Sequence, residues 1–125
     1  MTMQYMLLIY ENEDIFGGPE KTGPVMADVG PRHFAFIGEI GEKRVGGGGL
    51  KGTAYATTVR TEGGKQTIHD GPFAETREQL GGYYVVEAAD LDEAIAIAKK
   101  VPLARDGAIE IRPLIALPPG IAAKR

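Results

Sequence analysis

Apolar residues are spaced along this chain in two patterns, one typical of strands and one typical of helices, and the two patterns alternate. Residues 3–10 (MQYMLLIY) and 83–88 (YYVVEA) are apolar on both faces, as expected of strands in the centre of a sheet. Residues 53–61 are rich in β-branched and aromatic side chains, and residues 108–115 alternate between apolar and charged ones. Both patterns are typical of strands with one face in water, so these two segments are predicted to form the edges of the sheet.

The first helical spacing lies between residues 25 and 40, where apolar side chains recur every three or four positions. Pro31 falls inside this stretch; it has no N–H to donate, and its ring clashes with the preceding turn. The main helix is therefore predicted to begin near Pro31, with at most a separate turn before it. It must end before the glycine run at residues 46–49, which is predicted to be a flexible connection.

A second helix is predicted over residues 91–101. Asp90 and Glu93 stand three residues apart, which is the spacing of a capping box, and Pro102 ends the helix. Between the two helices, the turn at residues 62–65 (EGGK) predicts an extra β-hairpin.

The resulting order of elements is strand, helix, strand, hairpin, strand, helix, strand, which predicts a ferredoxin-like α+β fold. We expect a single domain over residues 1–117 and a flexible tail over 118–125. Two helices can cover only one face of this sheet, so the doubly apolar central strands leave a second apolar face to be buried. A second copy of the same sheet is the simplest cover, and the sequence therefore predicts a homodimer; a long loop folded over that face is the alternative.

Composition narrows the function classes. Fourteen basic and seventeen acidic residues give a net charge of −3, and the charges are scattered, so no basic stripe indicates nucleic-acid binding. The chain has no cysteine, which removes thiolate catalysis and cysteine-ligated zinc. The apolar run at residues 5–10 is too short for a membrane span or a signal sequence, so the expected location is the cytoplasm, away from membranes.

The segment GGGLKG at residues 47–52 has the glycine spacing of a dinucleotide-binding loop. That motif follows a strand and opens a helix, whereas this segment follows a helix and precedes a strand, so no dinucleotide cofactor is expected. The two histidines, His33 and His69, have no ligand-like spacing, and no metal or other cofactor is expected.

Asp70-Gly71-Pro72-Phe73 is the most distinctive local motif. The Asp70 carboxylate is suited to accepting backbone N–H groups in a turn, and this structural role is favoured over a catalytic one. Phe73 is expected to fill a hydrophobic gap rather than stack on a ligand.

His33 lies on the apolar stripe of the first helix, where a packed, hydrogen-bonded histidine is the commoner interpretation. The topology nevertheless places His33 and Asp70 at the same end of the sheet, so a shared pocket and an acid–base pair form the catalytic hypothesis. Arg112 shares a face of the last strand with Glu110, which favours an exposed or interfacial ion pair; an anion-binding arginine is the alternative.

The chain also resembles a known family. The resemblance rests on the run DGPFAETREQLGGYYVVEAADLDEAIAIAKKVP with the later IEIRP, on MQYMLLIYENED, and on the hairpin TAYATTVRTEGGKQTIHDGPF. These motifs are similar to those of the DGPF branch of the YCII-related family and cover nearly the whole chain. The resemblance implies the dimeric α+β barrel superfamily, in which two ferredoxin-like sheets pack face to face.

For activity the resemblance implies less. Members are largely uncharacterised; some are encoded beside extracytoplasmic-function sigma factors, and in related proteins a His and an Asp that meet in a pocket imply an enzyme. His33 lies near the position of that histidine. The Asp-Pro that related proteins carry at the end of the second helix is Val101-Pro102 here, which leaves Asp70 as the nearby substitute.

Two function classes follow. The first is a homodimeric small-molecule-binding or accessory protein, which the resemblance links to sigma-factor regulation, with Phe73, Tyr83 and Arg112 as ligand-binding residues. The second is a cofactor-free enzyme that uses His33 and Asp70 on a small organic acid. The sequence favours the first and leaves open whether the protein is an enzyme.

Overall fold

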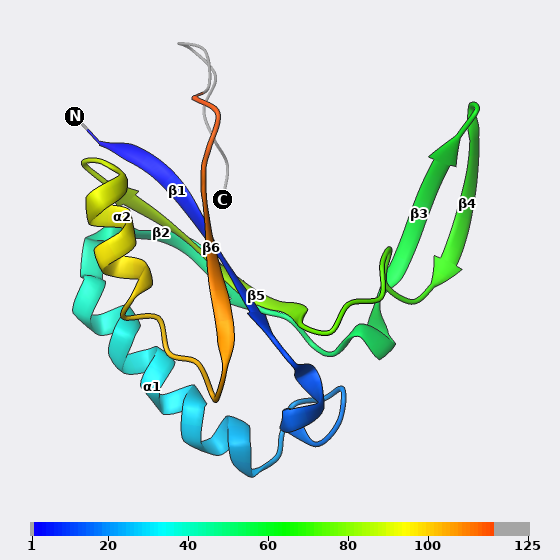
Figure 1. The fold of residues 1–125 in the computed structure, drawn as a ribbon, viewed down its shortest axis with the longest axis horizontal. Helices are drawn as coiled ribbons and strands as arrows, with labels where there is room; N and C mark the ends of the chain where they lie inside the picture. Colours follow the sequence, from blue (N-terminus) through cyan, green and yellow to red (C-terminus); the bar gives the residue numbers. More distant parts are fainter. Residues whose placement is uncertain (1, 117–125) are drawn as a thin grey trace.

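The computed structural model describes residues 2–116 and contains a four-stranded sheet, a two-stranded sheet and two α-helices over that range (Figure 1). The expected C-terminal tail at 118–125 lies outside the described residues. The helices are α1 (Pro24–Ile40) and α2 (Leu91–Ala98). The strands are β1 (Met3–Glu11), β2 (Arg44–Gly49), β3 (Thr57–Glu62), β4 (Lys65–Asp70), β5 (Gln79–Ala88) and β6 (Gly107–Pro113).

The main sheet has the strand order β2-β5-β1-β6, and every pairing within it is antiparallel. Both helices cover the same face of this sheet (Figure 1). The predicted ferredoxin-like α+β architecture is therefore confirmed. The two strands that are apolar on both faces, β1 and β5, occupy the centre as predicted.

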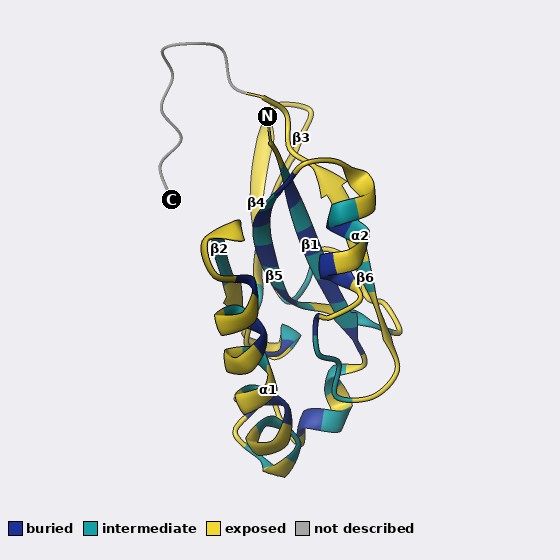
Figure 2. Ribbon diagram, turned by 90° about the vertical axis from the view of Figure 1, so that its left-hand side faces the viewer, coloured by how far each residue is buried: buried dark blue, intermediate teal, exposed yellow. Residues whose placement is uncertain are grey.

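The register divides the side chains of the central strands between two faces. Leu7 lies opposite Tyr84, and the side chains that alternate with them on the same face are buried beneath the helices, as the dark stripe in Figure 2 shows. This helix-covered face consists of Tyr5, Leu7, Ile9, Tyr84, Val86 and Ala88. The open face carries half-buried apolar side chains, namely Met6, Leu8, Tyr10, Tyr83 and Val85.

One predicted edge strand is wrong. The sheet edge next to β5 is the glycine-rich β2, not residues 53–61, and the run at 46–49 is a strand rather than a flexible connection. Gly47 explains why glycine is needed there: it has φ +158°, and a Cβ at this position would lie 2.7 Å from the Tyr83 carbonyl oxygen. The close approach of the two backbones excludes a side chain.

The predicted hairpin forms, but as a separate two-stranded sheet of β3 and β4 that projects away from the main body (Figure 1). Nearly all of its side chains are exposed. Val59 and Ile68 lie opposite each other across the pair and are 61% and 76% exposed. This arm thus carries apolar side chains that the described chain does not cover.

The main helix begins seven residues earlier than predicted. Pro24 occupies its first turn, and Pro31 lies inside the helix rather than at its start. Val29, Phe36 and Ile40 are buried on the inner face, whereas Pro31 is exposed. Burial of the apolar stripe on both sides of Pro31 outweighs the loss of one backbone hydrogen bond, so the helix continues through the proline.

The second helix is confirmed with a shorter extent, because α2 ends at Ala98 and isolated turns continue to Val101. The Asp90 carboxylate accepts the Glu93 N–H at 2.9 Å. The Glu93 carboxylate in turn accepts the Ala89 N–H at 2.8 Å, one residue before the expected partner of a capping box.

Replacing Pro31 with Ala should stabilise the protein by about 1–3 kcal/mol, because the substitution restores an N–H donor inside α1 and removes a ring clash. Urea denaturation measures the change. Pro24→Ala is the control: proline is well tolerated in the first turn, so this variant should unfold within ~0.5 kcal/mol of the wild type. A less stable Pro31→Ala variant would contradict the account of α1.

Candidate functional site

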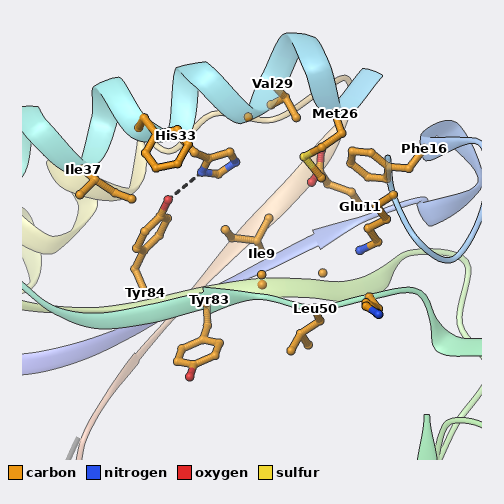
Figure 3. A pocket seen from close by; sticks show the side chains of 18 of the residues that line it. Ile9, Glu11, Phe16, Met26, Val29, His33, Ile37, Leu50, Tyr83 and Tyr84 are labelled. Carbon is orange, nitrogen blue, oxygen red and sulfur yellow. Dashed lines mark hydrogen bonds between the residues drawn. The ribbon is translucent and has the colours of Figure 1, made fainter. Parts of the chain in front are cut away.

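A pocket of about 390 Å³ lies between α1 and the helix-covered face of the sheet (Figure 3). Its volume is that of a site for a small organic molecule. Most of its wall is apolar and is formed by Ile9, Phe16, Met26, Val29, Ile37 and the Tyr84 ring.

Glycines create the space inside this pocket. Gly30 of α1, Gly48 and Gly49 of β2, and Gly82 of β5 all line it. A Cβ at Gly30 would meet only the Met26 sulfur, at 3.8 Å. A side chain at Gly30 would extend from α1 into this space, so glycine at this position leaves it open.

His33 and Tyr84 form the polar centre of the pocket. The His33 Nδ1 atom and the Tyr84 hydroxyl are 2.7 Å apart, and the two rings stack with centroids 5.9 Å apart (Figure 3). Burial, with a smaller contribution from the nearby Arg32 charge, lowers the pKa of His33. Burial also raises the pKa of Tyr84. At neutral pH the pair is therefore an uncharged hydrogen-bonding group in an apolar wall.

Lys21 is the second polar feature of the pocket, and it is only 9% exposed. It has φ +55°, a left-handed conformation that is uncommon outside glycine. Its Nζ atom lies 5.2 Å from the centroid of the Phe16 ring. Burial lowers the pKa of Lys21, while the charges of Glu13 and Glu11 act in the opposite direction.

Asp70 is placed elsewhere. It ends β4 and borders a second, more polar hollow of about 840 Å³ beside Glu13 and Glu75, whereas His33 lines the first pocket. No hydrogen bond or ion pair joins His33 to Asp70 in the described part of the chain. The structure of the single chain therefore does not bring the proposed acid–base pair together.

Other groups hold the turn after Asp70. The Gly71 N–H donates to the Ala56 carbonyl at 2.8 Å, and the Thr58 hydroxyl donates to the Gly71 carbonyl at 2.8 Å. No hydrogen bond from a backbone N–H to the Asp70 carboxylate is present among residues 2–116. The backbone and Thr58, rather than the Asp70 side chain, thus fix this turn.

Of the three predicted ligand-binding residues, only Tyr83 borders the pocket that contains His33. Phe73 is 73% exposed and lies 5.3 Å from the Arg60 guanidinium, so within the described chain it does not fill a hydrophobic gap as expected. Tyr83 borders the pocket, but its ring points away from α1 on the opposite side of β5 (Figure 3). Arg112 forms the exposed ion pair with Glu110 that the sequence favoured, at 3.5 Å.

Comparison with known proteins identifies the family. A sequence model of the YCII-related domain matches residues 3–118. The chain belongs to the YCII-related family. It is also 36% identical over 124 residues to the uncharacterized protein R00369 of Rhizobium meliloti (strain 1021), an alignment that covers 94% of this chain and 97% of that protein. The family predicted from the sequence motifs is thereby confirmed.

In this YCII-related protein the sequence pattern points to His33 but not to Lys21 or Phe16. Lys21 lies in a segment rich in Glu, Gly and Pro, and such a lysine is normally exposed. Only the packing of the segment between β1 and α1 against the sheet buries it. Nothing in the local pattern distinguishes it from the other lysines.

Within 2–116, no group of three or more His, Asp or Glu side chains is arranged to hold a metal ion. Neither α1 nor α2 has the length and apolar character needed to cross a membrane.

The lowered pKa of His33 predicts how stability depends on pH. Below pH 6.5 the unfolded chain takes up a proton at this position before the folded chain does. The contribution of His33 to the free energy of unfolding is therefore fully present above pH 6.5 and is lost as the pH falls through the folded pKa. Urea midpoints measured between pH 8 and pH 5 should fall less steeply for His33→Gln than for the wild type. His69→Gln, in the exposed hairpin, is the control and should follow the wild type. Parallel wild-type and His33→Gln curves would refute this prediction.

Proposed function

We propose that this YCII-related protein is a homodimer that binds a small, largely apolar molecule in the pocket between α1 and the sheet. The observation that carries the proposal is a preformed, ligand-sized apolar pocket that contains the uncharged His33–Tyr84 pair. Binding sites of small molecules commonly combine an apolar wall with a few converging polar groups. In the described part of the chain His33 and Asp70 line different hollows, so the geometry of one chain does not support acid–base catalysis as the alternative.

The open face of the sheet supports the dimer. Neither helix covers this face, and its central positions carry Met6, Leu8, Tyr10, Tyr83 and Val85. Apolar surface in water costs about 25 cal/mol per Å², so packing against a second copy of the sheet is favourable. Because a two-fold dimer uses the same surface on both copies, the open face alone can form the interface.

The projecting hairpin gives independent support. An isolated two-stranded hairpin is marginally stable in water, and this one exposes Val59 and Ile68. In a dimer the arm would have a second chain to pack against. The open face and the arm therefore indicate the same occupant, another copy of this chain.

Tyr83→Glu should dissociate the dimer, because it places a charge on the open face in both copies. Light scattering at micromolar concentration is expected to give twice the chain mass of 13.3 kDa for the wild type and a single chain mass for the variant. Ala96→Glu, on the exposed side of α2, is the control and should remain dimeric. A wild-type mass of 13.3 kDa would exclude the homodimer.

Gly30→Met should block the pocket, because the new side chain enters it from α1. The fluorescence of the apolar dye N-phenyl-1-naphthylamine should rise on binding to the wild type, and the variant should bind it at least tenfold more weakly. Gly38→Met, at an exposed position of the same helix, should bind normally. Both variants should gain about 0.5–1 kcal/mol of stability from the loss of a helical glycine. Equal dye binding by wild type and Gly30→Met would rule out this pocket as the site.

A further inference from the structure

Lys21 occupies an unusual position for a lysine. It lines the apolar pocket, it is nine-tenths buried, and its Nζ atom lies against the Phe16 ring. The Nζ atom is also 3.4 Å from the point that a Cβ of residue 81 would occupy, so glycine at this position leaves room for the amine. The fold thus brings one amine into the interior of a ligand-sized site.

The amine is not paired. No carboxylate lies within ion-pair distance of Lys21 Nζ in the described part of the chain. The two carboxylates whose charges act on Lys21 bind other donors: Glu11 accepts the Ala104 N–H at 2.8 Å, and Glu13 accepts the N–H and the hydroxyl of Thr53. A buried ammonium without an ion-pair partner is costly, and burial therefore favours the neutral amine.

We propose that Lys21 is a nucleophilic amine, and that the pocket captures small aldehydes or ketones with an apolar body as imines on its Nζ atom. This inference rests on the binding function proposed above and names the chemical class of the ligand. A desolvated lysine in an apolar site is a recognised form of activated amine. The apolar wall holds the body of the ligand, and Lys21 reacts with its carbonyl carbon.

The step is balanced without an oxidant or a metal. The lone pair of Nζ attacks the carbonyl carbon, and a proton passes through water from nitrogen to the resulting alkoxide oxygen. The nitrogen then loses its second proton as the carbon–oxygen bond breaks, and one water molecule leaves. Hydrolysis of the imine releases the carbonyl compound unchanged, so the capture is reversible.

Reductive trapping tests this proposal. The wild-type protein is incubated at pH 7 with benzaldehyde and sodium cyanoborohydride, digested, and examined by mass spectrometry for benzylated lysines. Lys51 is the internal control, because it lines the same pocket but is exposed and ion-paired with Glu20 at 3.3 Å. Lys21 should be modified at least about tenfold faster than Lys51, because a desolvated, unpaired amine is the more reactive nucleophile. Excess N-phenyl-1-naphthylamine should abolish this preference.

Two variants separate the inference from the binding function. Lys21→Met keeps the length of the apolar stem; it should still bind the dye but lose preferential trapping. Gly30→Met should lose both. If the wild type binds the dye and Lys21 reacts no faster than Lys51, the reactive amine is refuted while the binding pocket stands. If preferential trapping occurs without dye binding, the amine stands and the apolar ligand site is refuted; if neither occurs, both are refuted.

Discussion

The antiparallel pairing of β1 with β5 determines most of the structure. By placing Leu7 opposite Tyr84, it assigns alternate side chains of both strands to one face that receives the helices and another that does not. A shift of β1 by one residue would turn its buried side chains toward the open face and expose Tyr5 and Leu7, which are almost completely buried. The same register directs the Tyr84 hydroxyl toward His33, so the core and the pocket depend on one alignment.

Missing side chains are as important to the site as those present. β2 approaches β5 so closely that Gly47 leaves no room for a Cβ, and neighbouring glycines leave a cavity beneath α1. A strand of larger residues would have paired less closely or filled that cavity. Glycine in β2 weakens the sheet edge but allows this close pairing, and glycine in α1 keeps the internal space open.

Elements whose signal is local in the sequence could be predicted, and those set by distant contacts could not. The central strands, the hairpin and the Asp90 cap follow from periodicity and turn chemistry. The path of α1 through Pro31 depends on burial of its inner face against the sheet, which the propensity of proline alone does not indicate. At the site, His33 stood out as a polar residue on an apolar stripe, whereas the burial of Lys21 depends on a loop whose course only tertiary packing determines.

The position of the central strand β1 in the sequence, ahead of both of its partners, has a consequence for folding. β1 is made first, yet its partners are β5 and β6, which end at Ala88 and Pro113. Pairings between such distant segments close late, because a long loop must be ordered before any contact forms. During synthesis, MQYMLLIY therefore remains unpaired until most of the chain has emerged. A strand that is apolar on both faces is prone to aggregate over that interval, so the early place of β1 in the chain raises the risk of aggregation during synthesis.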